Sequence, residues 1–196
     1  MIDRYTRPDM KRIWSEENKY DKWLQVELAV CEAWTDEGVI PQGDMKKIRT
    51  ASFDIERTKV IFERTRHDMT AFLRSVTEQL GNEGRWIHLG LTTSDVWDTS
   101  LSLQILESVD ILLKDIDKLM DAVAGKALEY KDTMMMGRTH GAYAEPITFG
   151  LKMALWYDEL ARQRDRLCHA QRHMSVGKIS GAVGTHATVS PSIEEK

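Results

Sequence analysis

The sequence has few residues that interrupt helices, with 4 prolines and 12 glycines among 196 residues. Long windows of the chain contain neither residue type. Such windows suit long helices better than the frequent turns of an all-β protein. The scarcity of proline and glycine therefore predicts an all-α protein.

Cysteine is also scarce, since Cys31 and Cys168 are the 2 cysteines of the chain. Both lie in predicted helices, where the plainest interpretation is a buried thiol. Two such thiols do not form the disulfide framework of a small secreted protein, and they fit a reducing compartment. We therefore expect a cytoplasmic protein.

Long runs of one residue class are missing as well. No apolar stretch is long enough to cross a bilayer, and the polar residues 1–5 lack the apolar core of a signal peptide. No lysine or arginine run forms a nucleic-acid footprint, and the net charge is −4 with both signs interspersed. We expect binding neither to membranes nor to nucleic acid. The composition, 42% hydrophobic and 30% charged, is instead typical of a globular protein.

Apolar residues at helical spacing predict the individual helices. The first strong pattern covers 15–37, where Ser15 can act as the N-cap. The longest pattern starts at Thr93 or Ser94 and continues for about thirty-five residues, a length typical of a rod in a helical bundle. Other predicted elements are an irregular arm over 1–13, helices over 43–51, 55–64 and 67–80, an extended segment over 133–137, a helix over 146–176 that starts at Pro146, and a glycine-rich loop over 177–185.

These elements divide the chain into two parts. A small helical N-terminal domain is predicted over 1–92. The first long helices of a bundle domain follow over 93–196.

Three short polar segments interrupt the helical pattern, and each contains a histidine. They cover 65–68 with His67, 88–95 with His88, and 137–141 with His140. Histidine titrates near neutral pH and is a frequent proton donor or acceptor in catalysis. Three such segments in one chain favour an active site.

The first two segments also have a structural interpretation. Asp68 can occupy a first helical turn, where the helix dipole favours negative charge. Thr92 and Asp95 have the spacing of a capping box. Hydroxyls and free backbone N–H groups at a helix start can equally bind a carboxylate or phosphate. Both interpretations remain open for these segments.

A functional interpretation is favoured for the third segment. Thr139 and His140 lie between two glycines, which allow a ligand to approach the backbone closely. Elsewhere, His169 and His173 have the spacing of metal ligands on a helix, but no third ligand candidate stands out. We expect neither a metal nor another cofactor.

Taken together, the segments resemble the fumarase/aspartase superfamily, and within it the adenylosuccinate lyases. The resemblance extends over essentially the whole chain, and the combination of motifs is specific although each motif alone is weak. The motifs are Arg4–Met10, Ile13–Ser15, Arg64–Asp68, Gly90–Val96, Gly137–Gly141 and Ser180–Thr185.

The resemblance implies a β-elimination that releases fumarate from adenylosuccinate, giving AMP, and from succinyl-aminoimidazole-carboxamide ribotide in purine biosynthesis. A base removes a proton next to a carboxylate, and an acid protonates the departing nitrogen. His140 resembles the general acid, and Thr139 a substrate-binding neighbour. His67 resembles a histidine that supports binding and orientation, with Arg66 and Asp68 beside it.

The remaining motif residues resemble binding groups. His88 resembles a histidine on the phosphate side of the site or in its hydrogen-bond network. Thr92 and Thr93 resemble the hydroxyls that hold the succinyl carboxylate. Arg4 and Tyr5 resemble the pair that binds the nucleotide phosphate, a role that suits the fork of an arginine.

One motif of the family is missing. The general base is a serine on a loop of the type Ser-Ser-x-Met-Pro-x-Lys, and this sequence does not contain that loop. Members also build each site from three subunits of a homotetramer. The chain therefore resembles the amino-terminal part of such an enzyme, and we expect it to have no lyase activity alone.

Two alternatives remain open. A sister lyase would release a product from argininosuccinate or from a carboxymuconate-type acid, although Arg4 and Tyr5 favour a nucleotide. A catalytically inert helical oligomerisation fragment would explain the long helices, but it would leave the three histidine segments as coincidences.

Overall fold

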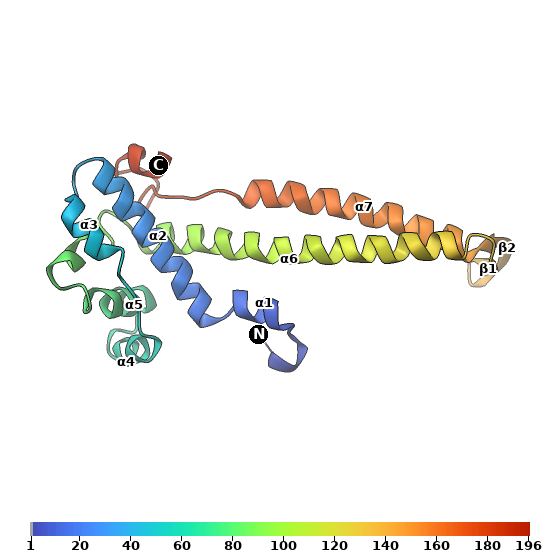
Figure 1. Ribbon diagram of the computed structural model, residues 1–196, viewed down its shortest axis with the longest axis horizontal. Coiled ribbons are helices and arrows are strands. Elements are labelled where there is room, and N and C mark those ends of the chain that lie inside the picture. The colour runs from blue at the N-terminus through green and yellow to red at the C-terminus, as the bar shows by residue number, and fades with distance from the viewer. Residues whose placement is uncertain (1) are drawn as a thin grey trace. The chain divides into compact units, whose positions relative to one another are not determined.

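The computed structural model describes residues 2–196, which form two compact units. Unit 1 contains the chain up to Ile105 together with Ser175–Lys196, and unit 2 contains Leu106–Met174. The described residues form eight α-helices, two 3-10 helices and one two-stranded sheet (Figure 1). The predicted all-α class is therefore confirmed, whereas the domain boundary after residue 92 stays a prediction.

Unit 1 begins with more helix than the sequence suggested. A 3-10 helix, η1 (Asp3–Tyr5), precedes α1 (Pro8–Ile13). The predicted irregular arm over 1–13 is therefore wrong for the described residues, and Met1 lies outside them. Proline fixes φ near its helical value, so Pro8 suits a first turn, and Ile13 at the end of α1 is completely buried.

The helix α2 (Glu16–Asp36) begins where the sequence predicted. The hydroxyl of Ser15 accepts a hydrogen bond from the backbone N–H of Asn18 at 3.1 Å. The buried face of α2 packs its aromatic rings against the ring of Phe72, which stacks with Tyr20 and meets Trp23 edge-on. The other helices of unit 1 are α3 (Gln42–Ile48), α4 (Ile55–Thr65), α5 (Asp68–Thr77), η2 (Gly81–Trp86), the first turns of α6 (Thr93–Glu129), and α8 (Pro191–Glu195).

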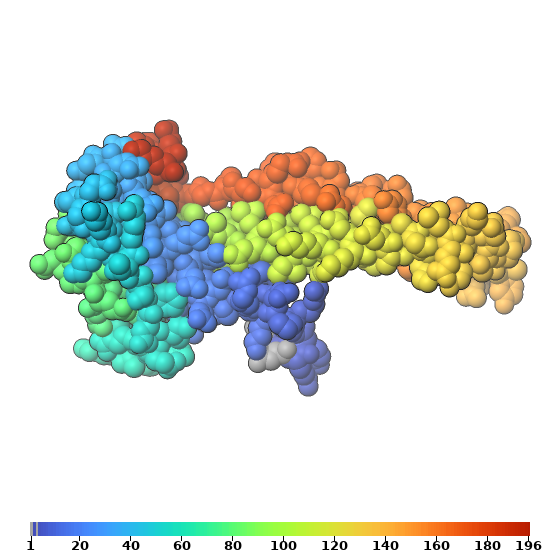
Figure 2. All heavy atoms as spheres, in the orientation of Figure 1, coloured from blue at the N-terminus to red at the C-terminus, as the bar shows by residue number. Residues whose placement is uncertain are grey.

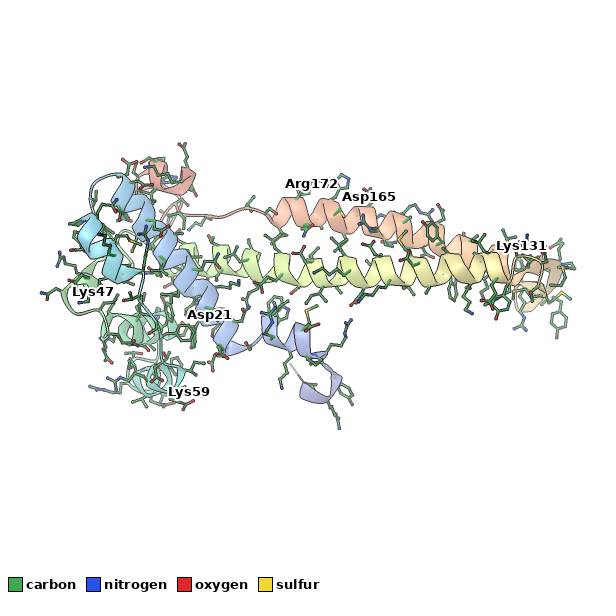
Figure 3. The ribbon with its side chains drawn as sticks, in the orientation of Figure 1. Asp21, Lys47, Lys59, Lys131, Asp165 and Arg172 are labelled. Carbon is green, nitrogen blue, oxygen red and sulfur yellow. The ribbon has the colours of Figure 1, made fainter. Side chains whose placement is uncertain are left out.

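Charged side chains cover the outside of unit 1. Lys47 on α3 and Lys59 on α4 both project from its surface (Figure 3). Lys47 pairs with Glu83 at 2.7 Å, and Lys59 with Glu56 at 2.7 Å. Such exposed pairs contribute little to stability, so most of the stability of this unit comes from its buried core. The C-terminal residues cover one end of α2 (Figure 2).

A buried carboxylate joins the start of α6 to the C-terminal segment of unit 1. Asp95 is completely buried and accepts hydrogen bonds from the backbone N–H groups of Thr92, Ser180 and Gly181. Its Oδ1 lies 2.7 Å from Nζ of Lys178. The bond to Thr92 confirms the carboxylate half of the predicted capping box. The same side chain also fixes a loop that is 85 residues further along the chain.

The surroundings of Asp95 determine its ionisation. Burial alone would raise the pKa of this carboxyl. The hydrogen bonds from Lys178, Thr92 and Ser180, with the positive charge of Lys178, outweigh burial and hold the pKa below the ordinary value of 3.8. Asp95 is therefore a carboxylate throughout the neutral range.

Unit 2 contains the rest of α6, a β-hairpin, and α7 (Phe149–Met174). The 37 residues of α6 confirm the long helix predicted from Thr93. The helix α7 runs back along this part of α6 (Figure 1). Arg164 on α7 pairs with Asp117 at 2.6 Å, and Gln171 donates a hydrogen bond to Asp110 at 2.7 Å.

The hairpin corrects the predicted start of the second long helix. Strands β1 (Met134–Thr139) and β2 (Ala142–Thr148) are antiparallel, and Pro146 lies in β2 opposite Met136. The prediction of a helix from Pro146 is wrong, because an extended partner strand was available to pair with residues 142–148. The helix begins instead after Thr148, whose hydroxyl accepts a hydrogen bond from Leu151 N at 3.1 Å.

No helix in the described part of the chain is both long enough and apolar enough to span a membrane.

Two glycines of unit 2 provide a matched test of helix packing. A Cβ on Gly150, in the first turn of α7, would lie 2.4 Å from the carbonyl oxygen of Ala127 and 2.5 Å from the Cα of Lys131. A Cβ on Gly125, inside α6, would meet nothing within 4 Å. We expect Gly150→Ala to lower the free energy of unfolding by roughly 1–3 kcal/mol through overpacking. Gly125→Ala should raise it by roughly 0.5–1 kcal/mol. Urea unfolding of both variants measures the two effects, and a shift of the same sign in both would contradict this account.

Asp95→Asn tests the buried ion pair. We expect a loss of roughly 2–3 kcal/mol in unfolding free energy at pH 7, below the 3–5 kcal/mol typical of fully buried pairs, because Lys178 is partly exposed. A carboxyl whose pKa is lower in the folded state stabilises the fold above its ordinary pKa, near 3.8, and loses that contribution as pH falls through the folded value. The variant should therefore lose less stability than the parent between neutral pH and acid.

Urea unfolding across that pH range makes the measurement. Ser94→Ala is the matched control, since it removes only a hydroxyl that accepts from Lys178 at 3.1 Å. It should cost about 1 kcal/mol and keep the parent's acid dependence. A parental acid dependence in Asp95→Asn would rule out the assigned role of this carboxylate.

Candidate functional site

Each of the three histidine segments contains a non-glycine residue with left-handed backbone. These residues are Arg66 at φ 52°, His88 at φ 68° and His140 at φ 53°. Among the other described non-glycine residues, His186 at φ 55° alone shares this conformation. Left-handed backbone costs a side-chain-bearing residue about 1–3 kcal/mol and gathers at functional sites. The strain therefore marks the same segments that the sequence marked by composition.

His67 is the N-cap of α5. Its Nδ1 accepts a hydrogen bond from the backbone N–H of Thr70 at 3.2 Å. Because Nδ1 accepts, the proton of the neutral ring belongs on Nε2, which is left as a donor. The side chain is 53% exposed, so that donor is accessible. Both the structural and the functional interpretation therefore fit this segment, because Nδ1 of His67 caps the helix while Nε2 stays available to a ligand.

Asp68 follows in the first turn of α5, as the structural interpretation required. Its Oδ1 accepts from Met69 N at 2.8 Å and lies 3.9 Å from Nδ1 of His67. Two surface hollows meet at this carboxylate, one of about 300 Å³ and one of about 250 Å³. The larger hollow is lined by Lys19, Trp23, Asp68, Trp97, Asp98, Ser100, Leu101 and Gln104. A ligand in this hollow would therefore meet aromatic, acidic, basic and amide groups.

His88 is held by a residue that the sequence interpretation missed. The completely buried carboxylate of Glu27, on α2, lies 2.7 Å from Nδ1 of His88 and accepts from the backbone N–H of the same residue at 2.8 Å. Glu27 interrupts the buried face of α2 between Trp23 and Val30. A carboxylate at an apolar position of a helix was the available signal, since buried charges require partners.

Two further bonds from α2 hold the same loop. The indole N–H of Trp34 donates to the carbonyl of Leu89 at 3.1 Å, and the thiol of Cys31 lies 3.6 Å from the carbonyl oxygen of Trp86. Residues 27, 31 and 34 share one helix face. Burial, and next the charge of Glu27, raise the pKa of the Cys31 thiol to about 12. The thiol therefore stays protonated and acts as a structural donor.

The two threonines predicted to bind a carboxylate lie at the start of α6. Thr92 and Thr93 are both half-buried. The backbone N–H of Thr92 already donates to the carboxylate of Asp95 at 2.9 Å. An external anion at this helix start would therefore have to use the hydroxyls and the remaining backbone N–H groups.

Arg4, Tyr5 and Arg66 are exposed. The guanidinium of Arg4 lies over the ring of Tyr5, 4.8 Å from its centroid, so the two side chains form one cationic and aromatic surface within η1. Arg66 pairs with Glu63 at 2.9 Å. These exposed contacts leave all three residues accessible to a ligand.

Thr139 and His140 lie at the exposed tip of the hairpin in unit 2. Thr139 pairs with Ala142, and the two residues between them, His140 and Gly141, both have positive φ. This is the pattern of a type I′ turn, which explains Gly141 without a ligand. The side chain of His140 is exposed.

The predicted site residues are thus divided between the units. His67, Asp68, His88, Thr92 and Thr93 belong to unit 1, and Thr139 and His140 belong to unit 2. Arg4, Tyr5 and Arg66 also belong to unit 1. The assignment of a site to these residues stays a prediction.

One histidine of the predicted metal-ligand spacing on α7 has other partners. His169 lies 2.7 Å from Nη2 of Arg172 and 3.7 Å from a carboxylate oxygen of Asp165; both neighbours are labelled in Figure 3. Within residues 2–196, no group of three histidine, cysteine, aspartate or glutamate side chains could hold a metal ion.

The sequence matches known proteins over its whole length. It is 53% identical to adenylosuccinate lyase from Bacillus subtilis and 52% identical to adenylosuccinate lyase from Aquifex aeolicus, in each case over 100% of this chain and 46% of the relative. The chain thus spans about half the length of these relatives. A fumarate lyase from Mesorhizobium has the same fold, with a TM-score of 0.88 and 28% identity over 95% of this chain and 46% of that structure.

The family described as lyase matches residues 3–196. That match leaves almost no residue outside it, and it includes all of the histidine segments. The chain therefore belongs to the lyase family.

Proposed function

We propose that this chain supplies active-site groups to an adenylosuccinate lyase, which releases fumarate from adenylosuccinate and from succinyl-aminoimidazole-carboxamide ribotide. The observation that carries the proposal is the 53% identity to the Bacillus subtilis enzyme over the whole chain. The chain covers 46% of that relative, so the remaining groups come from elsewhere. The reaction takes place in the cytoplasm within purine biosynthesis.

His140 acts as the general acid that protonates the departing nitrogen. Its exposed position in a two-residue turn supports this role, because the ring is accessible and the turn holds its backbone in one conformation. Thr139 binds substrate beside it. The serine base is supplied by a segment that this sequence does not contain.

The groups of unit 1 bind and orient the substrate. The free Nε2–H of His67 donates to an acceptor on the substrate, and Asp68 beside it binds the polar part of the nucleotide. Thr92 and Thr93 hold the succinyl carboxylate with their hydroxyls. Preorganised donors of this kind stabilise the charge that accumulates on the carboxylate in the transition state.

The phosphate is bound by Arg4 and Tyr5. His88 belongs to the hydrogen-bond network of the site, and Arg66 binds substrate beside His67. The exposed guanidinium of Arg4 is free to form two parallel bonds to a phosphate. No metal or organic cofactor is needed for this set of groups.

The active enzyme is a homotetramer. Support comes from apolar side chains of unit 2 that are at least two-fifths exposed in the single chain. They include Leu112, Leu119, Leu151, Leu155 and Trp156. Large exposed apolar patches mark contacts between proteins, and exposed leucines on two long helices suit such contacts.

Two proteins test the function. The 196-residue chain alone should release no fumarate from adenylosuccinate, because it lacks the serine loop. A chimera that joins this chain to the rest of the Bacillus subtilis relative should release fumarate. The assay includes argininosuccinate and a carboxymuconate-type acid, and activity on one of these alone would replace the proposed substrate. An inactive but folded tetrameric chimera would favour an inert scaffold.

The control variant in that chimera is His140→Asn. Asparagine tolerates positive φ, so the turn should persist while the acid is lost. We expect kcat to fall by about 10²–10⁴-fold, the usual contribution of a general acid.

His67 allows capping and catalysis to be separated. Asparagine is a good N-cap and alanine is a poor one. We expect His67→Ala to lower the free energy of unfolding of the chain by about 1 kcal/mol, and His67→Asn to leave it within about 0.5 kcal/mol of the parent. Both variants should lower fumarate release in the chimera by at least about tenfold, since both remove the imidazole donor. Full activity in His67→Asn would reduce the role of His67 to capping.

A further inference from the structure

Glu27 has a geometry that a helix-surface glutamate does not need. Its side chain is completely buried at the centre of α2, and both of its oxygens bond to one residue, His88. Oε2 accepts from the backbone N–H at 2.8 Å, and Oε1 lies 2.7 Å from the ring Nδ1. The two bonds fix the left-handed backbone and the side-chain rotamer of His88 together. Neither bond alone would do both.

We propose that Glu27 is a positioning residue of the active site, which holds the proton of His88 on Nδ1 and presents Nε2 as the atom that meets the substrate. This proposal has two parts. The position of the proton on Nδ1 rests on the geometry of Glu27 and His88 alone. The contact of Nε2 with a substrate rests on the proposed function as well.

The position of the proton follows from the chemistry of the partner. A carboxylate has no hydrogen to donate, so a ring nitrogen 2.7 Å from it must be the donor. The proton of the neutral ring is therefore on Nδ1, and Nε2 carries the lone pair. The ring of His88 is 22% exposed, so it is not sealed inside the core as Glu27 is.

His67 has the opposite arrangement. Its Nδ1 accepts from a backbone N–H, so its neutral ring carries the proton on Nε2. The chain thus fixes one histidine as a donor and the other as an acceptor, each at the nitrogen that its protein partner leaves unused. The two histidines therefore offer opposite hydrogen-bonding groups to the ligand that each one meets.

The thiol beside Glu27 adds no second charge to its surroundings. Cys31, one turn along α2, has its pKa raised to about 12 by burial and next by the charge of Glu27, so the neighbouring thiol remains uncharged. Trp34 and Cys31 hold the loop on either side of His88 through the carbonyls of Leu89 and Trp86. The loop therefore has other attachments to α2, and these provide a control for the specific effect of Glu27.

The experiment measures the ring nitrogens of His88 directly. In the 196-residue chain labelled with ¹⁵N-histidine, protonated and unprotonated ring nitrogens differ widely in chemical shift. His88→Asn identifies the signals by their loss, since asparagine tolerates positive φ. At a pH at which the ring of His88 is neutral, we expect the parent chain to carry a proton on Nδ1 and none on Nε2. A proton on Nε2 in the parent chain would overturn the proposal, whether or not a Glu27→Gln variant folds.

Glu27→Gln then tests the cause. An amide of nearly the same shape can donate to Nδ1, which allows the proton to move to Nε2. We expect that reversal in Glu27→Gln. Trp34→Phe is the matched control, because it removes a bond from the same helix to the same loop and should leave the proton on Nδ1. No reversal in Glu27→Gln, or the same reversal in both variants, would contradict the proposal.

Kinetics of the chimera test the substrate half. Removing the partner of a metal-binding histidine commonly lowers affinity or activity by about 10–100-fold. We expect a loss of similar size for Glu27→Gln, but a loss of less than about threefold for Trp34→Phe. Equal losses would mean that Glu27 acts only on the fold. If the parent chimera has no lyase activity, the proposed function fails while the measured proton position stands. If the chimera is active but the proton of His88 is on Nε2, the proposed function stands and the proposed role of Glu27 fails.

Discussion

Two completely buried carboxylates fix the irregular segments of unit 1. Glu27 binds the loop before α6, and Asp95 binds the segment after α7. Irregular backbone carries N–H groups that have no partner within a helix or sheet, and leaving such groups buried and unpaired is costly. A carboxylate can accept from several of them at once. Glu27 and Asp95 therefore give partners to backbone N–H groups at His88, Thr92, Ser180 and Gly181 that would otherwise need another acceptor.

Each carboxylate has a different counterpart, and this decides what the segment can do. Asp95 faces the ammonium group of Lys178 and several backbone donors, so its charge is satisfied within the fold. Glu27 faces an imidazole, which has a second nitrogen on its far side. The arrangement at Asp95 therefore only holds two segments of the chain together. The arrangement at Glu27 also sets the hydrogen-bonding role of Nε2 of His88, an atom of a partly exposed ring.

The sequence predicted the features that depend on local patterns. Helix α2 with its cap at Ser15, and the long helix from Thr93, follow from periodicity and capping alone. The second strand was missed because residues 142–148 are extended only by pairing with β1, and Pro146 in isolation suits a helix start equally well. Tertiary pairing of this kind leaves little local signal.

The candidate site shows the same division. The histidine segments stood out by composition, and the strain at Arg66, His88 and His140 agrees with that selection. Glu27 did not stand out, because its partner lies 61 residues away and a single glutamate in a helix is unremarkable by composition. Its place on the buried face of α2 was the only signal in the sequence, and only the fold shows that its partner is His88.

Unit 1 is discontinuous in the chain, and this has a consequence for synthesis. Glu27 and His88 have both left the ribosome well before unit 2 is complete, so their contact can form early. Asp95 must wait for Lys178 and Ser180, which follow only after the whole of Leu106–Met174 has been made. During that interval the helix start carries a carboxylate without its cation. The N-terminal core can thus assemble first, and arrival of the C-terminal segment is the step that locks it.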